Sequence, residues 1–208
     1  MIIRSQSEAD SVAAAGFSEV YQPVKSYLDD LDIFLQSQVQ ELEPEVQEHV
    51  RYVFGHSGKR LRPIFSVVAA QVAGAPTTED AVQGGIACEL VHLGSLYHDD
   101  VMDESPTRRG VETVNAKWGN LQAILAGDFL LARASEIAAS LGTEVAALLA
   151  RTIGRLCEGQ IEELRHTYNV ARPVESYLSS ISGKTASLYA TAARIGGLVS
   201  KFDAPMVN

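Results

Sequence analysis

The sequence has only two cysteines, Cys88 and Cys157, in 208 residues. A disulfide framework needs more cysteines, and neither of these has the spacing of a metal-ligand pair. We therefore expect two buried thiols in a reducing compartment, and a cytoplasmic location. No apolar stretch follows Met1 as in a secretion signal, and no uninterrupted apolar run approaches ~18 residues. The sequence thus predicts neither secretion nor a transmembrane segment.

Basic residues are also scarce, because 17 lysines and arginines face 26 acidic residues and the net charge is −9 at pH 7. A chain this acidic has no general attraction to nucleic acid or to an anionic membrane surface, so any phosphate binding must be local. Aromatic residues contribute only 7%, whereas hydrophobic residues, many of them alanine and leucine, contribute 46%. This composition predicts an all-α fold. The length suits one helical domain over residues 1–208, with residues 1–17 as a loose leader.

Glycine and proline divide the sequence into helical segments. Helices are predicted over about residues 20–35, from Pro44 to the glycines at 55–58, and over about 63–73, 78–104, 115–141, 143–166 and 173–197. Pro106 and Gly110 mark a loop after the fourth of these segments. Short connections between about six to eight helices describe a bundle.

Four acidic residues, Asp99, Asp100, Asp103 and Glu104, end a long apolar helical pattern. In a helix, Asp99 and Asp103 lie one turn apart on one face and repel each other unless a cation lies between them. A few hard oxygen ligands open to solvent suit Mg²⁺, which keeps several waters and shares its other positions with substrate phosphates. The alternative is an acidic helix end turned to water, which costs only ~0.3 to 1 kcal/mol per charge. The spacing alone leaves both possibilities open.

His92 lies seven residues before Asp99, within about 20° of the same helix face. The resulting stripe is Glu89, His92, Leu96, Asp99 and Asp103, and its polar members must face water, a metal or another polar ligand. A lone histidine would more often be a satisfied core residue. In line with two aspartates, a functional His92 is favoured.

Two basic clusters stand out against the acidic background. Lys59-Arg60-Leu61-Arg62 precedes a helix that opens at Pro63, where free amides and the positive end of the helix dipole favour a phosphate or diphosphate. Arg108-Arg109 follows the acidic cluster closely. The alternative for each cluster is solvated surface. Acidic metal ligands beside arginines predict a site for a metal-bridged polyphosphate.

Two further segments carry polar residues at unusual places. Gly183-Lys184-Thr185 does not form a P-loop, because a P-loop needs a glycine where Leu178 stands and a strand before it. Lys184 can still contact phosphate from a helix break. Gln160 follows Gly159 in an apolar pattern and points either into a cavity, as a substrate-binding residue, or towards a neighbouring helix. The pattern does not distinguish the two.

The order and spacing of these segments resemble the trans-isoprenyl (polyprenyl) diphosphate synthases. The matching segments are Gly58–Pro63, Glu89–His92, His98–Glu104, Arg108–Gly110, Gly127–Leu130, Gly159-Gln160 and Lys184-Thr185. The resemblance implies an all-helical bundle of the isoprenoid-synthase type, usually a homodimer, that uses Mg²⁺. The implied reaction condenses isopentenyl diphosphate with an allylic diphosphate.

The resemblance also implies roles for single residues. Asp99 and Asp103 would bind Mg²⁺ that bridges the allylic diphosphate, with Asp100 supporting them, and Arg108 would contact that diphosphate. The residues implied to lie near the allylic diphosphate are Lys184 and Thr185, and those implied to hold isopentenyl diphosphate are Lys59, Arg62, His92 and Arg109.

Product length in this family depends on the side chains just before the first aspartate-rich motif, where bulk blocks the tunnel for the growing hydrocarbon. Here Gly94 and Ser95 stand five and four residues before Asp99. Neither can block much space, so we expect a medium to long polyprenyl product. Tyr97 is too near the metal end to form a floor.

The sequence departs from the family pattern in one respect. Members carry a second aspartate-rich motif downstream of the segment that matches Lys184-Thr185, and this sequence has none; the isolated Asp203 cannot replace it. We expect a fragment of a longer protein rather than a shortened paralogue, because the other motifs are intact. The chain as given is predicted to be inactive or severely impaired.

Three other functions compete with this interpretation. A noncatalytic partner subunit of a prenyl synthase would explain the missing motif but not the intact Asp99 and Arg109. A class I terpene cyclase would share the acidic motif but has no use for a second diphosphate site at Lys59. A metal phosphohydrolase using His98-Asp99 with the histidines at 49 and 56 leaves the basic clusters unexplained.

Overall fold

The computed structural model describes residues 59–72, 79–202 and 204–207 and the isolated positions Ile33, Ser37, Pro44, Gln47, Glu48 and Tyr52. The expected leader, the helix expected over 20–35 and most of the helix expected from Pro44 lie outside the described residues. So do His49 and His56, which the phosphohydrolase alternative uses, and Asp203, the isolated acid near the end of the sequence.

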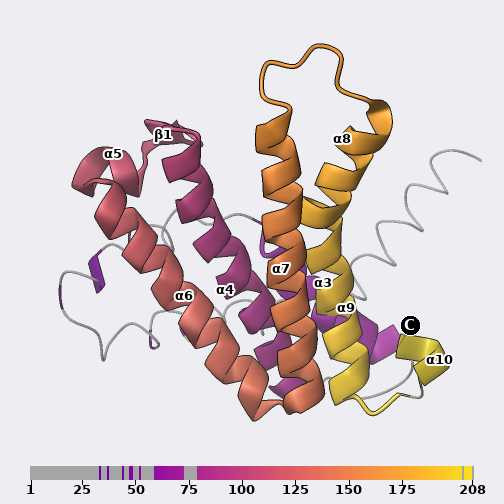
Figure 1. Ribbon diagram of the computed structural model, residues 1–208. Coiled ribbons are helices and arrows are strands. Elements are labelled where there is room, and N and C mark those ends of the chain that lie inside the picture. Colours follow the sequence, from indigo (N-terminus) through magenta and orange to yellow (C-terminus); the bar gives the residue numbers. More distant parts are fainter. Residues whose placement is uncertain are drawn as a thin grey trace, which may run out of the picture.

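The described residues are almost entirely helical, which confirms the all-α prediction (Figure 1). In chain order the elements are α3 (Leu61–Val72), α4 (Glu79–Met102), β1 (Thr107–Arg108), β2 (Val111–Glu112), α5 (Val114–Trp118), α6 (Asn120–Ser140), α7 (Thr143–Arg165), α8 (Val174–Ile181), the π-helix η1 (Ser182–Ala186), α9 (Ser187–Val199) and α10 (Ala204–Val207). Among these described helices, none has the length and apolar character needed to cross a membrane.

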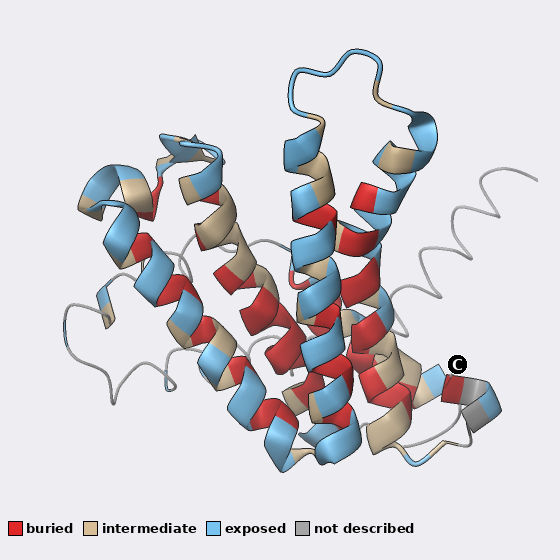
Figure 2. Cartoon of the chain, in the orientation of Figure 1, coloured by how far each residue is buried: buried red, intermediate tan, exposed pale blue. Residues whose placement is uncertain are grey.

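Helix α4 lies at the centre of the described fold and packs against α6, α3 and α9 (Figure 1). Helix α7 packs against α6, α9 and η1. The buried faces meet in one core that includes Leu90, Leu130, Leu149, Leu188 and Ile195. Figure 2 shows buried and exposed positions alternating along α6, as an amphipathic helix requires. Most of α4 is buried, so polar side chains on it need partners inside the fold.

Two helix boundaries differ from the predicted ones. The helix expected over 115–141 is split at Gly119, which lies between α5 and α6. Its φ of 93° is a conformation that glycine adopts readily. Helix α3 begins before Pro63, because Arg60 adopts a φ of 50° and its carbonyl accepts the amide of Ile64 at 3.3 Å. Pro63 therefore lies inside the first turn, where its missing N–H has no helical acceptor to lose.

Two segments contain more structure than expected. The loop after α4 holds an antiparallel hairpin of β1 and β2, turned by Arg109 (φ 53°) and Gly110 (φ 80°), which have the positive φ of two-residue hairpin turns. Figure 1 shows β1 and α5 beside the carboxyl end of α4. The helix expected over 173–197 consists of α8, η1 and α9, so Lys184 lies in a π-helical segment.

The two cysteines differ in environment. Cys88 is buried in α4, as expected, and burial raises the pKa of its thiol to about 12. The same expectation is wrong for Cys157, which is exposed. The reason is that Cys157 lies on the side of α7 that lines a cavity instead of the core.

Candidate active site

The polar stripe of α4 borders two cavities. One, of about 400 Å³, lies between α4, the start of α3 and the β1–β2 hairpin, and we call it the cationic cavity. The other, of about 540 Å³, lies between α4, α6, α7 and η1, and we call it the apolar cavity. Arg62, His92 and Leu96 line both, so the two cavities adjoin along α4.

The cationic cavity brings the two basic clusters together. Its basic side chains are Lys59, Arg60, Arg62, Arg108 and Arg109, and the acidic residues in its lining are Glu89, Asp100 and Glu112. The four residues predicted to hold isopentenyl diphosphate therefore line one cavity. Arg108, which the resemblance assigns to the allylic diphosphate, lies in this cavity as well.

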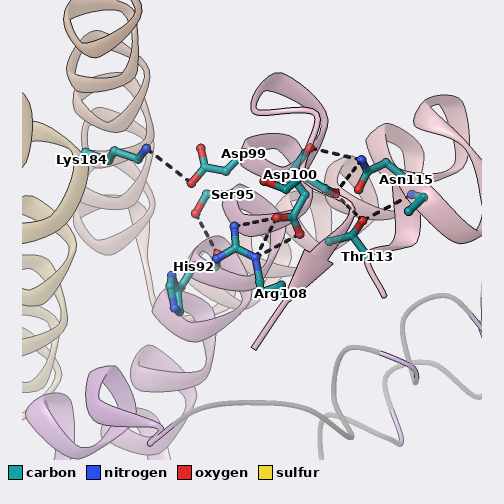
Figure 3. A network of polar contacts seen from close by, with 10 residues as sticks. His92, Ser95, Asp99, Asp100, Arg108, Thr113, Asn115 and Lys184 are labelled. Carbon is teal, nitrogen blue, oxygen red and sulfur yellow. Dashed lines mark hydrogen bonds and ion pairs between the residues drawn. The ribbon is translucent and has the colours of Figure 1, made fainter. Parts of the chain in front are cut away.

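Carboxylates hold two of these cations. Nε of Arg108 donates to both carboxylate oxygens of Asp100, at 2.9 and 3.0 Å, and its Nη2 lies 2.7 Å from Oδ1 (Figure 3). Nη1 of Arg60 donates to Oε1 of Glu89 at 3.2 Å in a buried ion pair. The cations of the cavity that form no ion pair with a described residue are Lys59, Arg62 and Arg109. Three cations thus line the cavity without an ion pair to any described carboxylate.

His92 is neutral in this environment. Burial, followed by the charges of four surrounding arginines, lowers the pKa of its imidazole to about 3. A neutral imidazole can donate a hydrogen bond to a diphosphate oxygen without adding charge. Its backbone carbonyl accepts the Ser95 hydroxyl at 2.8 Å, and the neighbouring Arg62 guanidinium lies 4.5 Å from the ring centroid of Tyr189. The cavity therefore holds cationic and neutral donors together.

The acidic end of α4 lies beside the apolar cavity. The amide of Asp103 donates to the carbonyl of Asp99 at 2.8 Å, so the helix continues and places the two carboxylates one turn apart. Nζ of Lys184 lies 3.8 Å from Oδ2 of Asp99 (Figure 3) and 2.7 Å from Oε2 of Glu163. Burial raises the pKa of Asp99, against the opposing effect of Lys184.

Asp99 and Asp103 suit Mg²⁺ better than a metal that needs many protein ligands. Within the part of the chain that the structure describes, no group of three or more His, Cys, Asp and Glu side chains is placed to hold a metal. Asp100 is engaged by Arg108. Asp99 lines the apolar cavity, whereas Asp103 lies outside its lining and is exposed. Two carboxylates leave coordination positions for waters and phosphate oxygens, which is how Mg²⁺ is usually bound. Magnesium at this pair stays a prediction.

The lining of the apolar cavity includes a few polar residues. Apart from the residues it shares with the cationic cavity, its polar lining comes from Ser95, His98, Asp99, Gln160, Lys184 and Thr185. Gln160 is only 8% exposed, and its Oε1 has no hydrogen-bond partner among the described residues. Its place in the cavity lining favours the first of the two interpretations, a side chain directed at a ligand. The remaining lining consists mainly of aliphatic side chains from α4, α6 and α7.

The structure separates the two residues predicted to set product length. Ser95 lines the apolar cavity. Gly94 is not part of that lining, and a Cβ at this position would lie 2.9 Å from the carbonyl oxygen of Gly127. Gly94 therefore allows the close approach of α4 and α6.

Several supporting residues escaped the sequence reasoning. Glu163 binds Lys184, and Tyr189 lies against Arg62, yet neither stands in a recognisable motif. Nδ2 of Asn115 donates to the carbonyl of Asp100 at 3.2 Å and so ties α5 to the end of α4 (Figure 3). The partnership of Glu89 with Arg60 had a signal, because a glutamate on a buried helix needs a cation.

Known proteins resemble this chain in sequence. The sequence model of the polyprenyl synthetase family matches residues 43–208. A nonaprenyl diphosphate synthase from Mycobacterium tuberculosis is 40% identical over 166 residues, which cover 80% of this chain and 50% of the relative. A heptaprenyl diphosphate synthase component 2 from Geobacillus stearothermophilus is 37% identical over 187 residues, covering 84% of this chain and 58% of the relative.

Solved structures resemble it in fold. A decaprenyl diphosphate synthase from Rhodobacter capsulatus has a TM-score of 0.85 at 30% identity, covering 91% of this chain and 59% of the other. A polyprenyl synthase from Caulobacter crescentus, complexed with calcium and isoprenyl diphosphate, has a TM-score of 0.85 at 29% identity, covering 90% and 57%. The chain spans about half the length of the curated relatives it matches. Because the family match covers most of the sequence and the fold agrees, the chain belongs to the polyprenyl synthetase family.

Proposed function

We propose that this chain provides the substrate sites of a Mg²⁺-dependent prenyltransferase that condenses isopentenyl diphosphate with an allylic diphosphate into a medium to long polyprenyl diphosphate. The observation that carries this proposal is the adjoining pair of cavities, one cationic and one apolar. The first suits a diphosphate and the second suits a hydrocarbon chain. The names of the relatives, nonaprenyl and heptaprenyl diphosphate synthase, support this product class.

Isopentenyl diphosphate fits the cationic cavity. Lys59, Arg62 and Arg109 form no described ion pair and can bind its diphosphate, with neutral His92 as a further donor. The amino end of α3 adds free amides and its dipole. With the diphosphate held there, the double bond is directed towards Leu96, where the two cavities adjoin.

The allylic diphosphate fits the acidic end of α4, with its hydrocarbon in the apolar cavity. Bound by Asp99 and Asp103, Mg²⁺ would neutralise this diphosphate and make it a better leaving group. Lys184 and Thr185 line the same end and bind the diphosphate directly. Oε1 of Gln160 has no partner in the described part of the chain and can stabilise positive charge on the substrate as the allylic C–O bond breaks. The isopentenyl double bond then attacks the allylic carbon, and the proton lost afterwards goes to the released diphosphate.

The direct test is prenyl transfer by the purified chain, given isopentenyl diphosphate, geranyl diphosphate and magnesium chloride. We expect slow transfer relative to longer relatives, because the sequence has one aspartate-rich motif, and none with EDTA or in Asp99→Asn. The matched control is Asp80→Asn, an exposed aspartate at the other end of α4. Transfer that EDTA and Asp99→Asn leave unchanged would refute the proposal. Transfer as fast as that of the longer relatives would refute the expected impairment.

Product length tests the tunnel. Ser95→Phe places an aromatic ring in the lining of the apolar cavity, so we expect shorter products than the wild type gives. Ser179→Phe makes the same change at an exposed position of α8 and should leave the length distribution unchanged. Chromatography of the dephosphorylated products measures both. If the wild type and Ser95→Phe both make only short products, the tunnel argument is wrong.

We also propose that the chain works as a homodimer. Helix α6 exposes Leu121 at 77% and Leu125 at 61%, which is apolar surface suited to a protein contact. The second candidate function is a noncatalytic partner subunit. The name of one relative, component 2 of a heptaprenyl diphosphate synthase, supports a partner subunit and leaves open which component is catalytic. Mixing the chain with a full-length synthase distinguishes the two. If the chain is noncatalytic, Asp99→Asn leaves the rate of the mixture unchanged.

A further inference from the structure

The buried ion pair of Glu89 and Arg60 lies in the lining of the cationic cavity. Glu89 is 2% exposed and Arg60 is 7% exposed. A carboxylate there is unfavourable for anion binding, because it repels the diphosphate that the other side chains attract. Its presence in the cavity needs a reason other than charge.

The backbone of Arg60 supplies that reason. Arg60 has a φ of 50°, in the left-handed region that non-glycine residues rarely adopt, and it immediately precedes the first residue of α3. Its carbonyl accepts the first described bond of the helix, from Ile64. A residue in this conformation persists only where its surroundings hold it. The guanidinium is fixed by Oε1 of Glu89 at 3.2 Å.

A second contact between α3 and α4 lies close to this ion pair. A Cβ added to Gly85 would lie 2.6 Å from Cα of Pro63, so the two backbones touch there. Gly85 and Glu89 are one helical turn apart on α4, Arg60 immediately precedes α3, and Pro63 lies in its first turn. The start of α3 is thus held at two points, one by close packing and one by the ion pair.

The residues on either side of Arg60 are the ones that face the ligand. Lys59 precedes it and Arg62 follows it by two, and both line the cationic cavity without a described carboxylate partner. The guanidinium of Arg62 lies over the Tyr189 ring, 4.5 Å from its centroid. A change in the backbone at Arg60 would move both cations.

We propose that Glu89 is a positioning residue for the diphosphate of isopentenyl diphosphate: by fixing Arg60 at the start of α3, it directs Lys59 and Arg62 into the cationic cavity. This inference rests on the proposed function, because it assumes a diphosphate in that cavity. For the diphosphate affinity of a variant without Glu89, positioning and simple electrostatics predict changes of opposite sign. Removing a negative charge from an anion site should tighten binding, whereas removing a positioning residue should weaken it.

The test is calorimetric titration of the full chain with inorganic diphosphate, in EDTA so that the acidic end of α4 has no metal to bind it. Glu89→Gln should weaken binding at least tenfold. The matched control is Glu112→Gln, which removes the same charge from the lining of the same cavity but has no described side-chain ion pair. It should bind as tightly as the wild type or more tightly.

Three outcomes separate the possibilities. Unchanged or tighter binding by Glu89→Gln overturns the inference and leaves the proposed function standing. A wild-type chain that binds no diphosphate overturns both. A lower unfolding midpoint with unchanged affinity of the folded protein also overturns the inference, because Glu89 would then serve only stability.

A second variant covers the case in which Glu89→Gln does not fold, as judged by circular dichroism. Arg60→Lys keeps both charges and loses only the planar guanidinium that Glu89 fixes. Its diphosphate affinity should fall at least threefold, and an unchanged affinity overturns the inference.

Discussion

Acidification tests the environment that the structure gives His92. In the folded chain, burial and the surrounding arginines lower the pKa of this imidazole to about 3, whereas an unfolded histidine has a pKa of about 6.5. Between these values the unfolded state binds a proton that the folded state does not, so the stability rises with pH. The contribution of His92 is fully present above the unfolded pKa and is lost as the pH falls towards 3.

The expected magnitude at pH 5 depends mainly on the unfolded value, because pH 5 lies well above the folded pKa. At pH 5, about 1.5 units below the unfolded pKa, each unit is worth about 1.36 kcal/mol. The contribution of His92 to the free energy of unfolding therefore falls by about 2 kcal/mol. His92→Gln has no proton to bind in this range. The free energy of unfolding of the wild type should therefore fall by about 2 kcal/mol more than that of the variant between pH 7 and pH 5.

Urea unfolding of both proteins at a series of pH values measures this difference. Other titrating groups are common to the two proteins and cancel in the comparison. If the two curves run parallel between pH 7 and pH 5, His92 is not buried among cations, and the geometry of the cationic cavity is wrong.

Two further changes test the packing around the site. Gly127→Ala should lower the free energy of unfolding by about 1–3 kcal/mol, because the new Cβ would lie 2.4 Å from Nε2 of His98. Gly154→Ala is the control, because its Cβ meets no atom within 4 Å, and its free energy of unfolding should rise by about 0.5–1 kcal/mol. Denaturant titrations measure both variants, and equal losses would contradict the close contact at Gly127. Thr152→Val should cost about 1–3 kcal/mol, because it leaves the buried Thr191 hydroxyl, now 2.6 Å away, without that partner. Thr191→Val should cost less, since Thr152 keeps its bond to a backbone carbonyl, and the same titrations compare the two.

The sequence predicted helices best where periodicity alone decides the structure. The helix into the acidic cluster ends at Met102, and the one after Gly142 ends at Arg165, both close to the expected ends. The prediction of helices failed at Gly119, because a single glycine inside a helical pattern is usually tolerated. Only the positive φ of this residue in the structure reveals the break. The π-helical turn that carries Lys184 has no such local signal.

The site was predicted as a set of residues but not as a geometry. The stripe on α4 and the two basic clusters follow from spacing, whereas their partners depend on which helices meet. Arg108 shows the difference, because its bidentate contact with Asp100 requires the β1–β2 hairpin to fold back on α4. Gly94 is a second example of a residue whose neighbours the sequence does not reveal. A small residue beside a tunnel and a small residue between two helices look the same in a sequence.

The positions of the two cavities follow from the stripe itself. Side chains three and four residues apart share one face of α4, so Glu89 and Asp99 lie at opposite ends of a wall with His92 and Leu96 between them. Arginines and a lysine surround the first end, and carboxylates suited to a metal stand at the other. In the function we propose, two diphosphates of like charge would be neutralised by different means at these two ends, and their hydrocarbon parts would meet beside Leu96. The spacing that first marked the stripe as unusual therefore separates the two charged groups that the proposed reaction between two diphosphate substrates would bring together.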